Sequence, residues 1–280
     1  MRIDEDEVPA ATSALPRSLF GYEVIGKLGE GAGSVIYAVN ERRSGQVYAL
    51  KHVVRKHERD MRYIKQLENE FEVTRKFRHP GLRRCFELKL GHSLFRRVNE
   101  AGLVMEMFDG VPLDKQRPAE LSVIIDRFAQ TARALSALHY LRFVHCDLKP
   151  NNILTDVQGR VKLIDFGQAC LIGTTKERIQ GTPDFIAPEQ VKLKPVTVRT
   201  DVFNFGATLY WALSGQRIPT LFTVPKDRRD VVLECKFPSP KDLNDQIPGP
   251  LSKLVMDCVH VVPGYRPEDM TEVLERLLKV

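Results

Sequence analysis

Two short segments of this sequence concentrate side chains that could bind a metal ion and a phosphate group. The first runs His145-Cys146-Asp147-Leu148-Lys149-Pro150-Asn151-Asn152, and the second, Asp165-Phe166-Gly167, begins eighteen residues after Asp147. Carboxylate and amide oxygens suit Mg²⁺, a hard cation that keeps phosphate oxygens among its ligands. Each of these residues alone is most often a turn former, but the whole set at this spacing predicts metal-and-phosphate chemistry.

A glycine-rich segment lies between two strand-like runs near the N-terminus and consists of Gly29, Glu30, Gly31, Ala32, Gly33 and Ser34. Glycine lets a backbone approach phosphates closely, and its free N–H groups can point at anions. A strand rather than a helix follows, which argues against a dinucleotide site, and no Gly-Lys-Ser/Thr completes a Walker loop. Taken alone, the segment is equally consistent with a hairpin that binds no ligand.

A lysine interrupts the apolar, strand-like run 47–53, which follows this segment. Because side chains alternate along a strand, Ala49 and Lys51 share a face. A lysine in such a run is usually an outward-facing surface residue, and one that faces inward needs an anionic partner. We predict that Glu70, on the helix that follows, is that partner, together with a phosphate.

The elements that must position these residues change character along the chain. Strand-like runs cover 22–28, 35–39, 47–53, 85–90 and 103–107, with one helical run at 61–77. Beyond a break at 109–112 the apolar residues follow helical spacing over 121–141 and from Met270 onward. The run 202–213 is apolar on nearly all sides, which predicts a central buried helix. The pattern predicts a small, sheet-rich lobe followed by a larger helical lobe, with the joint near 107–112.

The composition is that of a folded domain with ordinary surface charge. Among 280 residues, 43% are hydrophobic and 28% are charged, which excludes disordered, collagen-like and coiled-coil classes. The net charge of +6 permits anionic partners without selecting one. The acidic N-terminus is no signal peptide, and the longest uncharged apolar stretch, 202–216, is too short and polar for a membrane span. Five scattered cysteines without a CxxC pair predict free thiols and a cytoplasmic location.

In order and spacing these motifs resemble those of the eukaryotic-type protein kinases, in particular the serine/threonine branch with its bacterial members. The resemblance covers about residues 20–280. It implies an α+β, bilobal, protein-kinase-like fold. A flexible tail would span 1–18, a small antiparallel sheet lobe with one main helix 19–108, and a larger, mostly helical lobe 109–280. Further matches to the family are Ala187-Pro188-Glu189, Asp201 and Arg266.

The resemblance also implies a role for individual residues. Asp147 would orient the substrate hydroxyl and accept its proton, Lys149 would steady the transferring phosphoryl group, and Asn152 and Asp165 would hold Mg²⁺. Lys51 would contact the ATP phosphates. Glu189 and Arg266 would form a buried structural ion pair. The residues implied to form the nucleotide site, including an adenine slot and a hinge, are Gly29, Glu30, Gly31, Ala32, Gly33, Ser34, Ile36, Ala49, Lys51, Glu70, Met105, Glu106, Phe108 and Leu154.

By this resemblance the chain is a serine/threonine protein kinase that transfers the γ-phosphoryl group of Mg-ATP to Ser or Thr hydroxyls of protein substrates. The alternative is a pseudokinase, a nucleotide-binding scaffold without turnover; the intact set Lys51, Glu70, Asp147, Asn152 and Asp165 argues against it. A small-molecule phosphotransferase is disfavoured by the segment 187–189. No specific nucleic-acid partner is expected, because the basic residues between 75 and 84 read as a solvated face or a docking patch.

Three positions depart from the family pattern. Ser34 replaces the third glycine of the loop, with a modest expected effect on ATP affinity. Cys146 replaces the arginine that commonly pairs with a phosphate on the activation segment, so we hypothesise that activity does not depend strongly on phosphorylation of that segment. Thr74 stands where an apolar residue usually packs on Phe166. It is expected either to loosen the helix and favour an inactive arrangement, or to bond to the carbonyl one turn back.

Overall fold

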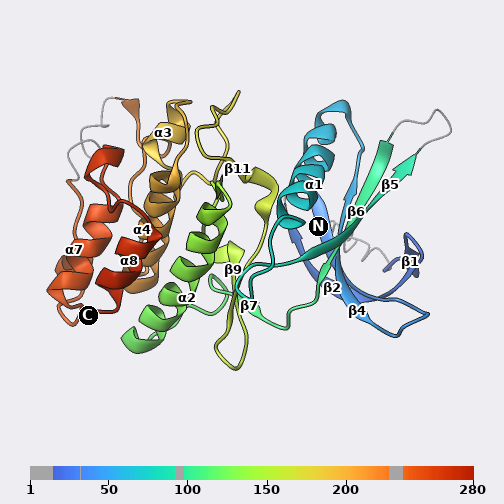
Figure 1. Cartoon of the computed structure of the whole chain (residues 1–280), viewed down its shortest axis with the longest axis horizontal. Coiled ribbons are helices and arrows are strands. Elements are labelled where there is room, and N and C mark those ends of the chain that lie inside the picture. The colour runs from blue at the N-terminus through green and yellow to red at the C-terminus, as the bar shows by residue number, and fades with distance from the viewer. Residues whose placement is uncertain (1–14, 32, 93–97, 227–235) are drawn as a thin grey trace, which may run out of the picture.

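The computed structural model of this chain describes residues 15–31, 33–92, 98–226 and 236–280. Of the predicted site residues, Ala32 lies outside this part, as do the first fourteen residues of the predicted tail. The chain forms two lobes, a sheet with one long helix beside a larger group of helices (Figure 1). The fold is mixed α and β, as the sequence predicts.

The small lobe is built on a six-stranded antiparallel sheet with the order β1-β2-β3-β4-β6-β5. All five predicted strands are present, although the one expected at 103–107 begins earlier, at Val98. A further two-residue strand begins at Ser18, inside the segment predicted as a tail. The strands are β1 (Ser18–Leu19), β2 (Tyr22–Gly31), β3 (Ser34–Asn40), β4 (Val47–Val54), β5 (Cys85–His92) and β6 (Val98–Glu106).

Helix α1 (Met61–Thr74) lies against this sheet and contacts β5 and β6. Its buried Ile64 and Leu67 share one apolar cluster with Ala49 and Leu103 of the sheet. The helix ends three residues before the predicted position 77. The residue before a proline disfavours the helical conformation, so the His-Pro pair at 79–80 favours an end of the helix ahead of it. Phe77 is buried outside the helix, where its ring meets that of Phe166 at 5.2 Å.

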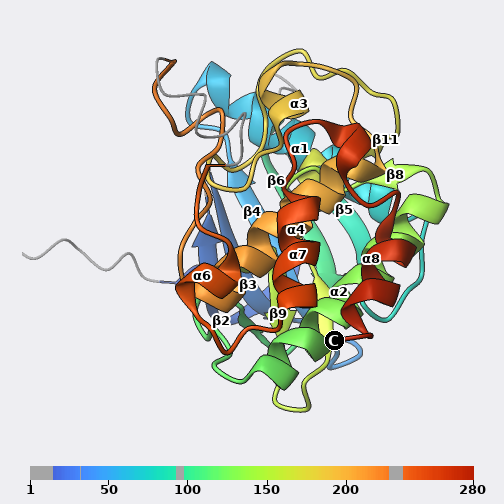
Figure 2. The ribbon, with the colours of Figure 1, turned by 90° about the vertical axis from the view of Figure 1, so that its left-hand side faces the viewer.

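The large lobe is organised around helix α4 (Val198–Ser214), which is buried on nearly all sides. Thr197 caps its first turn and Gly215, with φ 72°, ends it. Figure 2 looks onto this lobe, in which α4 contacts α7 and α2. The other helices are α2 (Leu121–Tyr140), α3 (Pro188–Val191), α6 (Pro240–Leu243), α7 (Gly249–Cys258) and α8 (Met270–Leu277).

The remaining elements are short strands, most of them flanking the loops of the large lobe, and single 3₁₀ turns. Strands β10, β9 and β7 form one small sheet, and β11 pairs with β8 in another. The strands are β7 (Val111–Pro112), β8 (Phe143–Val144), β9 (Ile153–Thr155), β10 (Val161–Leu163) and β11 (Cys170–Leu171); the 3₁₀ turns are η1 (Glu58–Asp60), η2 (Pro150–Asn152), η3 (Phe166–Gln168) and η5 (Pro263–Tyr265). None of the helices in the described ranges is long and apolar enough to cross a membrane.

The lobes meet at a second place besides the hinge that follows β6. The N–H of Leu163 donates to the carbonyl of Gly81 at 2.8 Å, and the N–H of Arg83 donates to the carbonyl of Leu163 at 3.0 Å. Leu82, between them, is fully buried in the core of the large lobe. Arg83 is therefore only 5% exposed, so the expectation that it belongs to a solvated basic face is wrong.

Candidate active site

The loop that carries Asp147 is held by a buried carboxylate at the start of α4. Asp201 accepts hydrogen bonds from the backbone N–H groups of His145 at 2.7 Å and Cys146 at 2.8 Å, and its other partner is His139 Nε2 at 2.8 Å. Burial alone would raise the pKa of Asp201, but the hydrogen bonds from His139 and from the backbone N–H of His145 hold that pKa below its ordinary value. An ionised Asp201 therefore fixes the backbone next to Asp147.

Lys51 lies at the centre of a charged network that joins the two lobes. Its Nζ is 2.8 Å from Glu70 Oε2 on α1 and 3.0 Å from Asp165 Oδ1 in the large lobe. The second oxygen of Glu70 accepts a hydrogen bond from the backbone N–H of Phe166 at 3.3 Å. The predicted contact between Lys51 and Glu70 is present, and it places α1 and the segment 165–167 in one arrangement.

The network keeps its groups charged. Burial alone would lower the pKa of Lys51, but the carboxylates of Asp165 and Glu70 outweigh burial and raise that pKa above its usual range. Burial alone would likewise raise the pKa of Asp165, but Lys51, with Lys149 and His145 behind it, lowers it to about 2. The site therefore presents an ammonium group and carboxylates at neutral pH, the charges that a metal-bound polyphosphate requires.

Asp147 belongs to a compact triangle of hydrogen bonds. Thr182 Oγ1 donates to Asp147 Oδ1 at 2.8 Å, and Lys149 Nζ donates both to Asp147 Oδ2 at 3.1 Å and to Thr182 Oγ1 at 2.8 Å. No role in the site was predicted for Thr182 from the sequence. The structure brings this hydroxyl, thirty-five residues away in the chain, onto the carboxylate expected to meet the substrate.

Asn152 and Asp165 offer oxygen atoms that fit Mg²⁺. The amide nitrogen of Asn152 donates to the carbonyl of Asp147 at 2.8 Å, which turns the amide oxygen to the opposite side and leaves it available to a cation. The parts of the chain that the structure describes hold no cluster of three His, Cys, Asp or Glu side chains suited to a metal. The donor set present fits a cation that takes its remaining ligands from phosphate and water.

The residues expected around adenine come from both lobes. Ala49 and Met105 are buried and lie opposite each other on β4 and β6. Ile36 on β3 is the register partner of Lys51, and Leu154 lies on β9 of the large lobe, two residues after Asn152. The structure thus places the apolar positions beside the charged network.

The hinge residues Glu106 and Phe108 differ in which backbone groups remain available for hydrogen bonds to a base. The carboxylate of Glu106 pairs with Lys162 Nζ at 2.8 Å, and its N–H donates to the carbonyl of Arg84 at 2.9 Å. No hydrogen-bond acceptor is found among the described residues for the N–H of Phe108. Glu106 can therefore contribute to a base only through its carbonyl, whereas Phe108 keeps a backbone donor available.

The glycine loop forms the tight end of the β2–β3 hairpin, where Gly29 pairs with Ile36 and Gly31 with Ser34. Gly33 has φ 80°, a conformation that favours glycine, and a Cβ there would lie 2.5 Å from the ring of Tyr63 on α1. No pattern in the sequence pointed to Tyr63. The side chain of Glu30 forms an exposed ion pair with Lys27. The predicted part of Glu30 in the nucleotide site therefore falls to its backbone.

Comparison with known proteins identifies the family. Residues 22–278 match the protein kinase domain. The chain belongs to this family. It is 26% identical over 92% of its length to a probable serine/threonine-protein kinase of Clostridium acetobutylicum and 30% identical over 84% to serine/threonine-protein kinase D3 of Homo sapiens. It is 34% identical over 67% of its length to serine/threonine-protein kinase PknA of Mycobacterium tuberculosis. The matches cover 40%, 26% and 45% of these three relatives, so the chain spans less than half of each.

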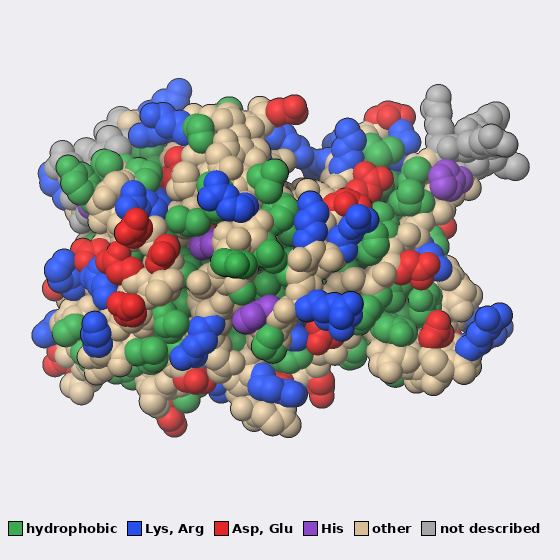
Figure 3. Space-filling model, viewed as in Figure 1, with side chains coloured by type: hydrophobic (Ala, Val, Ile, Leu, Met, Phe, Trp, Pro, Cys, Tyr) green, Lys and Arg blue, Asp and Glu red, His purple; other side chains and the backbone are tan. Residues whose placement is uncertain are grey.

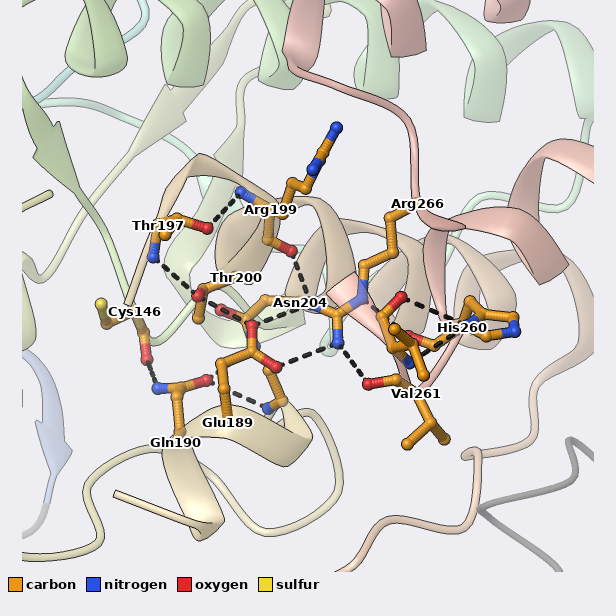
Figure 4. A network of polar contacts seen from close by, with 12 residues as sticks. Cys146, Glu189, Gln190, Thr197, Arg199, Thr200, Asn204, His260, Val261 and Arg266 are labelled. Carbon is orange, nitrogen blue, oxygen red and sulfur yellow. Dashed lines mark hydrogen bonds and ion pairs between the residues drawn. The ribbon is translucent and has the colours of Figure 1, made fainter. Parts of the chain in front are cut away.

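The ion pair predicted for this kinase domain between Glu189 and Arg266 is present and buried. Arg266 contacts the two carboxylate oxygens of Glu189 at 2.8 and 2.9 Å, and Thr200 Oγ1 also donates to Glu189 at 2.8 Å. The remaining guanidinium hydrogens reach the carbonyls of Arg199, His260 and Val261 (Figure 4). All five donors of the guanidinium are therefore used inside the protein.

Thr74 of this kinase domain forms a hydrogen bond within its own helix. Its hydroxyl donates to the carbonyl of Glu70 at 2.7 Å, which is the second of the two outcomes expected from the sequence. The side chain is 2% exposed, and the ion pair between Glu70 and Lys51 is intact. The described arrangement therefore has α1 in contact with the rest of the site.

Asn69 is a positioning residue that the sequence did not reveal. Its amide nitrogen lies within 3.3 Å of the carbonyl oxygens of Phe166, Gly167 and Ala169. These contacts hold turn η3 against α1, directly after Asp165. Asp165 itself has φ 65°, a strained value for a residue with a side chain, and such strain persists only where surrounding contacts impose it.

Proposed function

We propose that this domain is an active serine/threonine protein kinase that transfers the γ-phosphoryl group of Mg-ATP to Ser or Thr hydroxyls of protein substrates. The observation that carries the proposal is the position of Lys51 Nζ, within 3.0 Å of both Glu70 and Asp165. Phosphoryl transfer depends on positioning and charge neutralisation more than on covalent help from the protein. A cytoplasmic location remains a prediction from the cysteine pattern.

Each charged group has one task in the proposed reaction. Lys51 binds the phosphates of ATP, and Asp165 with Asn152 holds Mg²⁺, which supplies charge neutralisation at the phosphoryl group when bound. Asp147 orients the substrate hydroxyl and accepts its proton, while Lys149 neutralises charge on the transferring group. The hydrogen bonds from Thr182 and Lys149 to Asp147 support this assignment, because they hold the carboxylate in one orientation.

The proposal is tested with an array of Ser-, Thr- and Tyr-containing peptides incubated with the chain and Mg-ATP. We expect phosphate on serine and threonine peptides, with a sequence preference that also reveals the substrate consensus. The acceptor residues are identified by phosphoamino-acid analysis. Transfer to tyrosine alone would contradict the assignment of the hydroxyl class.

Replacing Thr182 with valine should lower kcat by about ten- to a hundredfold. The valine keeps the volume but removes a hydroxyl bonded to the Asp147 carboxylate, and hydrogen bonds to charged groups contribute about 1.5–3 kcal/mol. The measurement is the initial rate at saturating ATP. The control is Thr182→Ser, which restores the hydroxyl and should restore most of the rate. Equal rates for the valine and serine variants would show that the hydroxyl has no such role.

Phosphatase treatment should leave the activity unchanged. Cys146 carries no positive charge, so a phosphate on Thr174 or Thr175 lacks the arginine partner that would fix the activation segment in other family members. Intact mass before and after treatment verifies the removal of phosphate, and the peptide assay gives the rate. A treated sample that loses its activity and regains it on incubation with ATP would overturn the hypothesis.

A further inference from the structure

Two cysteines meet where the catalytic loop, residues 145–152, touches the activation segment, residues 165–189. Cys146 Sγ and Cys170 Sγ are 3.8 Å apart, although the residues are 24 positions apart in the chain. The pairing of β8 with β11 explains the contact, because it sets Cys170 opposite Val144, two residues before Cys146. The sequence predicted isolated free thiols, so this proximity is a property of the fold alone.

The two sulfur atoms differ in accessibility. Cys146 is 1% exposed, whereas Cys170 borders a cavity of about 430 Å³ between α1 and the activation segment. Figure 3 shows basic side chains near the notch between the lobes on this face of the molecule. The charged residues that line the cavity are Arg62, Lys65, Lys176, Glu177 and Arg178, four cations and one anion. A small oxidant can therefore reach Cys170 from solvent, but not Cys146.

The surroundings also shift the pKa values of the two thiols in opposite directions. The hydrogen bond from the Cys146 thiol, with Lys176 nearby, lowers the pKa of Cys170 to about 7. The same hydrogen bond, together with burial, raises the pKa of Cys146 well above its ordinary value. At neutral pH a substantial fraction of Cys170 is thus thiolate, the reactive form of cysteine, with basic side chains nearby, and Cys146 remains a protonated neighbour.

We propose that Cys146 and Cys170 form a redox-active pair that closes a disulfide bond between the catalytic loop and the activation segment when a peroxide oxidises it. The Cys170 sulfur attacks hydrogen peroxide and becomes a sulfenic acid, releasing hydroxide. The Cys146 sulfur then displaces the sulfenic hydroxyl as water, losing its own proton. In balance, two thiols lose two electrons and two protons, and one peroxide becomes two waters.

The geometry allows this bond with little movement of the catalytic loop. The sulfur atoms must approach from 3.8 Å to the disulfide length of about 2.05 Å. The backbone of Cys146 is fixed by Asp201 at its N–H and by Gln190 Nε2, 2.8 Å from its carbonyl. Its sulfur points away from that network (Figure 4). Cys170, on a two-residue strand, is therefore the partner that moves.

The bond would connect the activation segment covalently to the loop of Asp147, so that segment could no longer open freely. Formation of the bond does not depend on the proposed kinase activity, because it can be measured without phosphoryl transfer. A cross-link that closes a loop of this size raises the melting temperature by several degrees when the native geometry accepts it.

The test treats the full chain with hydrogen peroxide, blocks remaining thiols with N-ethylmaleimide and maps peptides without reductant. We expect one linked pair, Cys146 with Cys170, in monomeric protein, with a higher melting temperature and full reversal by dithiothreitol. In Cys146→Ser the sulfenic acid on Cys170 should persist and be trapped by dimedone. The matched control, Cys85→Ala, removes a buried cysteine of the small lobe and should leave the cross-link intact.

Three results would overturn the proposal. In the first, N-ethylmaleimide would still label both Cys146 and Cys170 after peroxide treatment. In the second, Cys170 would be linked to another cysteine or to a second chain. In the third case Cys170 would oxidise to a sulfinic acid while Cys146 stayed free. Because wild-type protein supplies these readouts, the outcome does not rest on whether the serine variant folds.

Discussion

Replacing Asp165 with asparagine should lower the rate of phosphoryl transfer by roughly a thousandfold. Asparagine keeps the shape of the side chain but removes its negative charge. That charge belongs to the proposed Mg²⁺ ligand, and the carboxylate lies 3.0 Å from Lys51 Nζ. Lys51 keeps Glu70 as a partner at 2.8 Å, so the fold should survive. The rate is measured with a peptide substrate at saturating Mg-ATP, and the melting temperature reports on folding.

The matched control for this variant is Asp245→Asn, the same chemical change at an exposed carboxylate of the large lobe. It should leave both the rate and the melting temperature unchanged. If Asp165→Asn kept more than a tenth of the wild-type rate, the role of Asp165 in holding the metal would be wrong.

Replacing Arg266 with methionine should destabilise the domain by about 3–5 kcal/mol, because it leaves the Glu189 carboxylate buried without its partner. Thr200 still donates to Glu189, but the carbonyls of Arg199, His260 and Val261 also lose their donors. For a domain of this size the melting temperature should fall by roughly 10 °C. Urea unfolding gives the free energy of unfolding directly.

Two further variants separate the buried pair from a general effect of removing charge. Lys253→Met breaks an exposed pair with Asp257 and should cost less than about 1 kcal/mol. The double variant Glu189→Gln with Arg266→Met removes the stranded charge and should recover part of the loss. A double variant less stable than Arg266→Met alone would contradict the explanation.

The sequence predicted the parts of the site that depend on local periodicity. Strand alternation placed Lys51 on the same face as Ala49, and the need of an inward-facing lysine for an anion led to Glu70 as its predicted partner; the structure has Lys51 and Glu70 in contact. The two-lobe order followed from the change between strand-like and helical runs. The family resemblance added the pairing of Glu189 with Arg266, which spacing alone does not reveal.

What the sequence could not predict depends on the path of loops. Thr182 reaches Asp147, and Cys170 reaches Cys146, only because the activation segment folds back over the catalytic loop. Such a segment carries no hydrophobic period that fixes its course. The prediction of an exposed Arg83 was wrong for a related reason. Backbone hydrogen bonds to Leu163 hold this segment between the lobes, whereas an arginine is mostly exposed when only its residue type is known.

The measurement that tests the central proposal most directly compares wild-type protein with Asp147→Asn in transfer of labelled γ-phosphate from Mg-ATP to a mixture of peptides. Nucleotide binding is followed in parallel by titration. We predict that both proteins bind Mg-ATP and that only the wild type places phosphate on serine and threonine. Wild-type protein that binds Mg-ATP but transfers no phosphate to any peptide would contradict the account and identify the domain as a nucleotide-binding scaffold.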